Sequence, residues 1–122
     1  MPLESGRITK AMRLRRRSEF LAVQGDGVKV HGRHLWVVAR RMATPSGTTG
    51  RAGFTVTKKV GNAVTRNRIR RQMREWLRTH GWVPAGWDVV FIAKDSAARV
   101  AGAALREDLA RAVRQLPSSA CS

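Results

Sequence analysis

Residues 51–75 read RAGFTVTKKVGNAVTRNRIRRQMRE, and the pattern of this stretch changes from that of a strand to that of a helix. The β-branched and apolar residues over Arg51 to Lys58 predict a strand. Gly61 ends it, and Asn62 is a favourable N-cap for a helix that we predict over Ala63 to Thr79. Apolar residues of this helix recur at i, i+4, i+7 and i+8, at Ile69, Met73, Trp76 and Leu77. The stretch therefore predicts a strand followed by an amphipathic helix that packs one face on a core.

The opposite face of this helix is strongly basic, because Glu75 is the only acid between Lys58 and Arg78. A solvated helix face usually mixes charge signs and pairs Glu with Lys four residues apart, which this face does not. Arginine suits phosphate since its planar guanidinium donates two parallel hydrogen bonds. The amide of Asn67 both donates and accepts, which suits a ribose hydroxyl or a base edge. The residues predicted to bind nucleic acid are Lys58, Lys59, Asn62, Arg66, Asn67, Arg68, Arg70, Arg71 and Arg74.

The charge balance of the whole chain also indicates a polyanionic partner. Its 122 residues include 24 Lys and Arg against 8 Asp and Glu, which gives a formal net charge of +16. Self-repulsion on this scale destabilises a compact fold unless a polyanion neutralises it, and nucleic acid is the best candidate. No apolar run reaches the roughly 20 residues that span a bilayer, and no apolar signal segment follows Met1. We therefore expect a cytoplasmic protein without a membrane partner.

The residue types that build metal sites, disulfides and active sites are scattered. Cys121 is the only cysteine and cannot form an intramolecular disulfide. His31, His34 and His80 do not stand at metal-ligand spacing with cysteines or carboxylates. No nucleophile–His–acid arrangement and no phosphate-binding glycine loop has a recognisable spacing. We expect neither catalytic residues nor metal ligands in the protein itself.

Upstream of the central stretch, the sequence predicts a basic segment, a helix and two strands. The basic segment contains Arg13, Arg15, Arg16 and Arg17. A helix is predicted over Ser18 to Gln24, with Ser18 as its N-cap and Glu19 in the first turn, where the helix dipole favours an anion. Strands are predicted over Val28 to Val30 and His34 to Arg40. The second of these and the central strand flank one loop, so an antiparallel hairpin is the simplest pairing.

Downstream, the sequence predicts one more strand and one more helix. Trp87 to Ala93 is almost continuously apolar, which is typical of a central strand covered on both faces. The last helix has an apolar face of Leu105, Leu109, Ala112, Val113 and Leu116. Pro117 ends it. Neither an internal repeat nor a second domain is evident.

The central stretch and its flanks resemble one known family. Lys-Lys-Val-Gly-Asn-Ala-Val, followed by Arg-Asn-Arg at residues 66–68, is similar to the signature of the bacterial ribonuclease P protein. Arg13-Leu-Arg-Arg-Arg-Ser-Glu-Phe20 resembles that family's entry into its first helix, and Gly86-Trp-Asp-Val-Val-Phe-Ile-Ala-Lys94 its last strand. The resemblance covers about residues 13–116. Arg-Asn-Arg alone is uninformative, whereas the 25-residue block in this order is specific.

The resemblance implies a fold and a function. The fold is an α+β, single-domain α-β-β-β-α-β-α sandwich of the ribosomal-protein-S5 type, with a left-handed βαβ crossover where the default is right-handed. The domain would span residues 13–117, between a basic arm at 1–12 and a flexible tail at 118–122. The RNA of ribonuclease P would remove the 5′ leader of precursor tRNA with Mg²⁺ held mainly by RNA. The protein, one monomer per RNA, would bind that RNA and the leader.

Alternation along the strands predicts where the leader binds. The more apolar face, expected to be the core, consists of Leu35, Val37, Phe54 and Val56. The opposite face carries Trp36, Thr55 and Thr57, and Phe20 comes from the first helix, so these four residues form the predicted leader cleft. Stacking of an unpaired base on an aromatic ring contributes ~1–3 kcal/mol and tolerates any sequence. Core packing is the alternative for both aromatic residues. The family often has further aromatics where this chain has Gln24 and Val38.

Three other classes of protein are alternatives. A ribosomal or other structural RNA-binding protein would have the same composition, and only the block from Lys58 to Glu75 separates the two. A DNA-binding module could place the basic helix in a major groove, but neither a dimerisation heptad nor helix-turn-helix spacing supports it. An enzyme with its own active site is disfavoured by the scattered acids. Even the adjacent Glu107 and Asp108 point about 100° apart on a helix.

Overall fold

The computed structural model describes residues 13–14, 16–41, 50–80, 82–83 and 86–115. The elements in chain order are α1 (Arg17–Asp26), β1 (Val28–His31), β2 (Leu35–Arg41), β3 (Arg51–Thr55), α2 (Ala63–Thr79), β4 (Trp87–Ala93), the 3₁₀ helix η2 (Asp95–Arg99) and α3 (Gly102–Arg114). This order confirms the predicted α-β-β-β-α-β-α succession, with η2 added before the last helix. The bounds of α2 and β4 are those that the sequence predicts.

The four strands form one sheet in the order β1-β2-β4-β3. The predicted hairpin between β2 and β3 is wrong, because β4 lies between them, antiparallel to β2 and parallel to β3. Six of the seven residues of β4 are buried, so this apolar strand needs cover on both faces and a neighbour on each side. A parallel pair needs a long crossover, and α2 provides it between β3 and β4.

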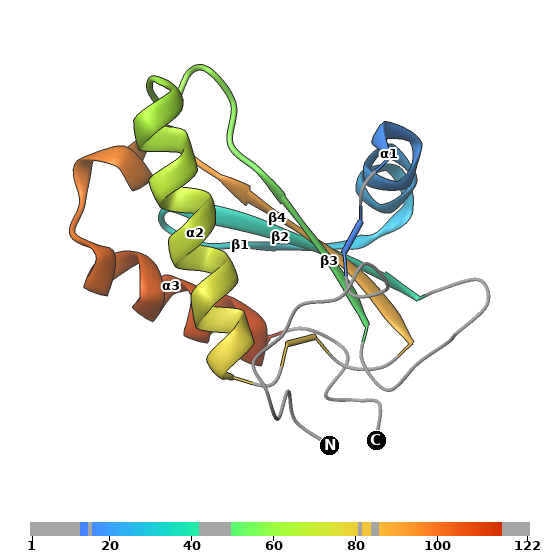
Figure 1. Cartoon of the computed structure of the whole chain (residues 1–122). Helices are drawn as coiled ribbons and strands as arrows, with labels where there is room; N and C mark the ends of the chain where they lie inside the picture. The colour runs from blue at the N-terminus through green and yellow to red at the C-terminus, as the bar shows by residue number, and fades with distance from the viewer. Residues whose placement is uncertain (1–12, 15, 42–49, 81, 84–85, 116–122) are drawn as a thin grey trace.

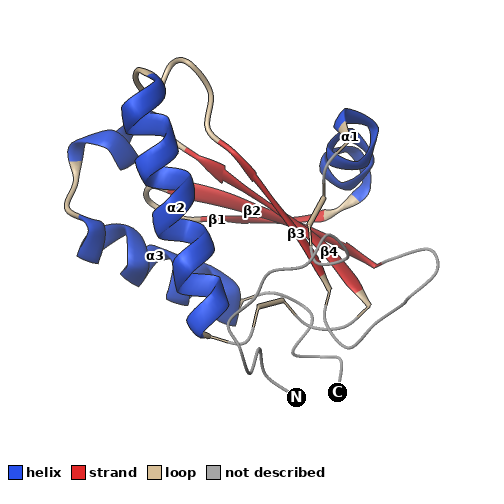
Figure 2. Cartoon of the chain, in the orientation of Figure 1, coloured by secondary structure: helices blue, strands red, loops and turns tan. Residues whose placement is uncertain are grey.

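The helices lie on opposite faces of the sheet, with α2 and α3 on one face and α1 on the other (Figures 1 and 2). The face below α2 and α3 holds the main core of twenty buried residues, among them Leu35, Val37 and Phe91. The face below α1 holds a separate small cluster, whose buried members are Leu14, Val23, Val38 and Val90. The predicted core face is confirmed for Leu35, Val37 and Val56, which are buried, and Phe54 packs against them partly exposed.

The first helix starts earlier than predicted. Ser18 lies inside the first turn, and Arg16 is the N-cap. The carboxylate of Glu19 sets this boundary, because its Oε1 accepts a hydrogen bond from the backbone N–H of Arg16 at 2.9 Å. The helix then continues through Gly25 and ends at Asp26.

The basic segment before α1 belongs partly to the fold. Arg13 forms an isolated parallel bridge with Ala52 of β3. The backbone N–H of Leu14 donates to the Ala52 carbonyl at 2.9 Å, and the Leu14 side chain is buried. Arg15 and the predicted arm at residues 1–12 lie outside the described residues. The chain is therefore held to the outer edge of β3 before α1 begins.

The strand ends differ slightly from the predictions. β3 stops at Thr55, and Val60 N–H donates to the Thr57 carbonyl at 3.0 Å in a turn that leads to α2. Asn62 is the N-cap of α2, as predicted, with its Oδ1 accepting from the Thr65 N–H at 2.9 Å. In α3 the predicted apolar face is buried at Leu105, Leu109 and Ala112. Leu116, Pro117 and the predicted tail lie outside the described residues.

Candidate RNA interface

The α2 helix has a buried apolar face and an accessible basic one. Ile69, Met73 and Leu77 are fully buried, as the helical spacing predicts, and Trp76 lies partly exposed at the margin of the core. The predicted nucleic-acid-binding residues all remain accessible. The exposed ones are Lys58, Lys59, Asn62, Asn67, Arg68 and Arg71. The half-buried ones are Arg66, Arg70 and Arg74.

Some of these side chains are held by neighbours on α2 itself. Arg66 Nε donates to the Gly61 carbonyl at 3.1 Å, and Arg70 Nη1 donates to Asn67 Oδ1 at 2.7 Å. The Asn67 oxygen is therefore engaged by Arg70, and its NH₂ group can donate to a ligand. The side-chain oxygen of Asn62 accepts the hydrogen bond that caps α2, so the first role of Asn62 is structural.

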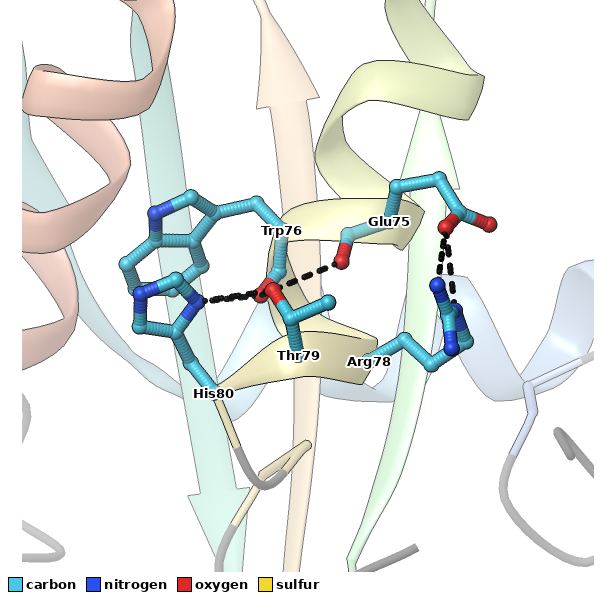
Figure 3. Close-up of polar contacts among 5 residues, drawn as sticks. All are labelled: Glu75, Trp76, Arg78, Thr79 and His80. Atoms are coloured by element: carbon cyan, nitrogen blue, oxygen red, sulfur yellow. Dashed lines mark hydrogen bonds and ion pairs between the residues drawn. The ribbon is translucent and has the colours of Figure 1, made fainter. Parts of the chain in front are cut away.

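The last turn of α2 is less suited to phosphates than the first three. Arg78 donates twice to Glu75 Oε1, at 2.9 and 2.6 Å (Figure 3). The hydrogen bond from Arg78 lowers the pKa of Glu75 below its ordinary value. Beside this pair, the rings of Trp76 and His80 stack with centroids 4.0 Å apart. The accessible, unneutralised cations of α2 thus end at Arg74.

The sheet face that carries α1 is only partly covered. The strand register places Trp36, Ile92 and Thr55 in one row across β2, β4 and β3. All three are partly exposed, whereas Val38 and Val90 in the next row are buried under α1. We call this row of Trp36, Ile92 and Thr55 beside α1 the open strip.

Two hollows adjoin the open strip, with volumes of about 600 Å³ and about 510 Å³. The larger, the Trp36 hollow, is lined by His31, Trp36, Thr57, Lys59, Ile92, Ala93, Lys94, Asp95 and Ser96. The smaller, the Phe20 hollow, is lined by Arg17, Phe20, Leu21, Gln24, Phe54, Thr55, Val56 and Arg70. Because Thr55 pairs with Ile92, the hollows are neighbours. The four predicted cleft residues therefore divide into two pairs, one in each hollow.

Trp36 is surrounded by groups that the sequence pattern does not single out. The His31 ring meets it edge-on at 4.9 Å between centroids. Lys94 Nζ lies 5.8 Å from the centroid of the indole and donates to the Gly32 carbonyl at 2.6 Å. The indole Nε1 is buried and has no partner among the described residues. A partly exposed indole with an ammonium over its ring is suited to stacking a base beside a phosphate.

Phe20 is both a core residue and a wall of its hollow. Its ring lies on Gly53, where an added Cβ would stand 2.5 Å from Phe20 Cε2. It also packs against the buried cluster under α1, so the core-packing alternative holds in part. Gln24 lines the same hollow, whereas Val38 is buried and cannot replace a cleft aromatic. In the basic segment, Arg13, Arg16 and Arg17 are exposed, and Arg17 reaches the Phe20 hollow.

An ion network on the same face was not predicted from the sequence. Arg51 of β3 donates through Nε and Nη2 to the two carboxylate oxygens of Asp88 in β4, each at 2.9 Å. Its Nη1 donates to Glu19 Oε2 of α1, also at 2.9 Å. Asp88 is buried, and its hydrogen bonds with Arg51 raise the pKa of the guanidinium. Asp88 is the single charged residue of the apolar strand β4, which is a signal that it needs a partner, but the sequence does not indicate that the partner is Arg51.

Comparison with known proteins agrees with this geometry. The ribonuclease P family matches residues 8–117 of the chain. The ribonuclease P protein component of Desulfovibrio desulfuricans is 40% identical over 92% of this chain and 91% of its own length. That of Gluconacetobacter diazotrophicus is 44% identical over 87% of this chain and 91% of its own. The chain belongs to the ribonuclease P protein family.

Solved structures of this family share the fold. The ribonuclease P protein of Staphylococcus aureus superposes with a TM-score of 0.78 at 28% identity, covering 86% of this chain and 94% of its own. That of Thermotoga maritima gives a TM-score of 0.71 at 30% identity, covering 84% and 96%. The chain is thus a bacterial-type protein subunit of the ribonucleoprotein endoribonuclease that processes tRNA 5′ ends, and its partner is the ribonuclease P RNA.

Two further features concern metal binding and membrane spanning. Among the described residues, no three His, Cys, Asp or Glu side chains stand close enough together to hold a metal ion. None of the described helices has the length and apolar character needed to cross a bilayer.

Proposed function

We propose that the open strip and its two hollows bind the 5′ leader of precursor tRNA, while the basic face of α2 binds the ribonuclease P RNA. The observation that carries this proposal is the separation of two surfaces of different chemistry. The hollows offer aromatic and hydroxyl groups to unpaired bases, whereas α2 offers guanidiniums to the phosphates of a folded RNA. Arg70 belongs to both surfaces, because it stands on α2 and lines the Phe20 hollow.

Within this proposal each hollow contributes a stacking ring and cations. Trp36 stacks one leader base, with Lys94 and Lys59 at the margin of its hollow for the adjoining phosphates. Phe20 stacks a second base, with Arg17 and Arg70 in the same role. Thr57 and Thr55 supply hydroxyls that donate or accept. Stacking and phosphate contacts tolerate any base, which suits leaders of varied sequence.

The protein would support cleavage without contributing reacting groups. We propose that the partner RNA holds the catalytic Mg²⁺ and that the protein raises local substrate affinity by binding the leader beside it. The cations of α2 would reduce the repulsion between the two RNAs when they approach each other. We further propose one copy of the protein per RNA, acting in the bacterial cytoplasm.

Cleavage of a precursor tRNA at low Mg²⁺, with and without this protein, tests the proposal. A bacterial ribonuclease P RNA is used with two substrates, one carrying a 5′ leader of several nucleotides and one a leader of a single nucleotide. We expect the protein to restore accurate cleavage and to favour the long leader. If it binds several RNAs tightly but changes neither cleavage nor leader preference, a structural RNA-binding role replaces this one.

A further inference from the structure

The three-residue network of Arg51, Glu19 and Asp88 joins α1 and β3, which both line the Phe20 hollow, to the central strand β4. Arg51 is on β3, Glu19 on α1 and Asp88 on β4, and all three donor–acceptor distances are 2.9 Å. The Arg51 and Glu19 side chains are 29% and 27% exposed and the Asp88 side chain 9%, so the network is partly shielded from solvent. Hydrogen bonds between charged groups in such surroundings are short and directional.

The other contacts that fix α1 on the sheet are a small apolar cluster and a longer ion pair, in which Asp26 lies exposed and 3.9 Å from Arg40 of β2. Val23 is the one fully buried side chain of α1 among the described residues, and Phe20 rests on the bare backbone of Gly53. The exposed Leu21 faces away from this packing and toward the hollow. A helix with so small an apolar contact can tilt or slide unless a directional interaction restrains it.

The nitrogens of the Arg51 guanidinium bind two different carboxylates: Nε and Nη2 bind Asp88, and Nη1 binds Glu19. Two nitrogens of the guanidinium neutralise the buried Asp88, which could not stay charged there without a partner. The remaining nitrogen, Nη1, donates to Glu19 and is not needed for that neutralisation. Glu19 at the same time accepts from the N–H of Arg16 at the start of α1. The ion pair between Arg51 and Glu19 therefore connects the first turn of α1 to the edge strand β3, and we call this ion pair the tie.

We infer that Arg51 and Glu19 are positioning residues that hold α1 at the distance from β3 at which the Phe20 hollow admits a base. This inference rests on the leader-binding function proposed above. The pair contacts no leader in this account. It acts through Phe20, which follows Glu19 directly, and Arg17, which lies two residues before it, so its loss weakens leader binding without removing any contacting group.

Two variants cut this tie while preserving the fold. Glu19→Gln keeps the side-chain acceptor for Arg16 but removes the charge that Arg51 pairs with. The double variant Arg51→Met/Asp88→Leu replaces the ion pair by apolar groups, a change that is often neutral for stability, whereas removing one partner alone is costly. Asp108→Asn is the matched control. Asp108 is a buried carboxylate on α3 that accepts from Arg33 and His34 N–H at 3.0 and 2.8 Å, on the other side of the sheet.

The first readout concerns the free protein and needs no RNA. Spin labels at Ala22→Cys and Val64→Cys, in a Cys121→Ser background, report the distance between α1 and α2. Both labelled positions are exposed. We expect a broader distance distribution in both tie-cutting variants and an unchanged one in Asp108→Asn. An unchanged distribution in the tie-cutting variants would overturn the inference whatever the protein binds.

The second readout is the affinity ratio of the holoenzyme for precursor tRNA with and without its leader. We expect this ratio to fall about tenfold in both tie-cutting variants, equivalent to about 1.4 kcal/mol. It should stay at the wild-type value in Asp108→Asn even where the melting temperature falls. A ratio that follows the melting temperature in all three variants would reduce the pair to a stabilising contact and overturn the inference. A wild-type ratio of one would instead overturn the proposed leader binding.

Discussion

The two faces of the sheet contrast in how completely they are covered. Under α2 and α3, twenty buried residues form a continuous core that includes Phe91 and Leu109. Under α1, the buried cluster has four members, and the row from Trp36 to Thr55 stays open beside it. The same strands therefore contribute one side chain to a closed core and the next to an accessible surface.

This contrast shows how a small basic protein separates stability from binding. A net charge of +16 opposes folding, so one face must supply enough apolar burial to hold the domain together. The other face can then leave aromatic side chains partly exposed, because it is not the main source of stability. Substitutions should accordingly fall into two classes, those that unfold the protein and those that weaken RNA binding.

The largest expected effect belongs to the closed face. Phe91→Ala removes a fully buried ring of β4 that stacks on Phe54 with centroids 5.5 Å apart. We expect a loss of about 3–5 kcal/mol in the free energy of unfolding, from lost burial and the cavity left behind. Urea denaturation of the free protein measures it. A loss below about 1 kcal/mol would contradict the assignment of the main core to this face.

The next effect is at the contact between α1 and the sheet. In Gly53→Ala the new Cβ would meet Phe20 Cε2 at 2.5 Å and Leu14 Cβ at 3.1 Å, so α1 must shift. We expect about 1–3 kcal/mol of destabilisation together with weaker leader binding. Gly25→Ala is the matched control on α1 itself, because its Cβ would have no neighbour within 4 Å. That variant should gain about 0.4–1 kcal/mol.

Substitutions in the open strip should weaken leader binding more than they destabilise the fold. Trp36→Ala should weaken leader-dependent affinity for precursor tRNA by ~1–3 kcal/mol, the value of one stacked base, and change the melting temperature less than Phe91→Ala does. Trp36→Phe keeps a stacking ring and should retain most of the affinity. Binding titrations with leader-bearing and leaderless tRNA measure both. An unchanged leader dependence in Trp36→Ala would show that the indole is a packing residue only.

Much of the fold could be predicted because local pattern and tertiary structure agree over its central part. The period of the apolar residues and the Asn62 cap predict the bounds of α2, and the unbroken apolar run of β4 predicts a central strand. The order of the strands could not be predicted in this way. Loop proximity favours pairing β2 with β3, but the greater burial gained by placing β4 between them decides the arrangement.

The candidate site could be predicted only where a residue type acts by itself. Arginines on one helix face and Trp36 on the polar face of a strand follow from spacing. Arg51, by contrast, acts through partners 32 and 37 residues away, and Lys94 through the position of its Nζ over the Trp36 ring. Long-range pairs of this kind depend on the strand order, which the sequence pattern did not yield.

A smaller effect separates phosphate contacts from orienting ones on α2. Arg71→Gln should reduce the salt dependence of RNA affinity by ~0.7–0.9 log units per log unit of salt, if one phosphate contact is lost. Asn67→Ala removes no charge, so affinity should fall with the slope unchanged. A changed slope in Asn67→Ala would show that Asn67 acts by orienting Arg70, to which it is hydrogen-bonded at 2.7 Å.

The smallest effect concerns the exposed pair at the end of α2. Arg78 lowers the pKa of Glu75, so the contribution of this pair to stability is present at neutral pH and is lost as the pH falls through that lowered pKa. Unfolding of wild type and Glu75→Gln should differ slightly at pH 7 and coincide in strong acid.

The same variant, Glu75→Gln, releases Arg78 for a phosphate contact. If the last turn of α2 lies on the RNA, the salt dependence of RNA affinity should steepen by up to the value of one phosphate contact. An unchanged salt dependence would place the end of the RNA-binding surface at Arg74.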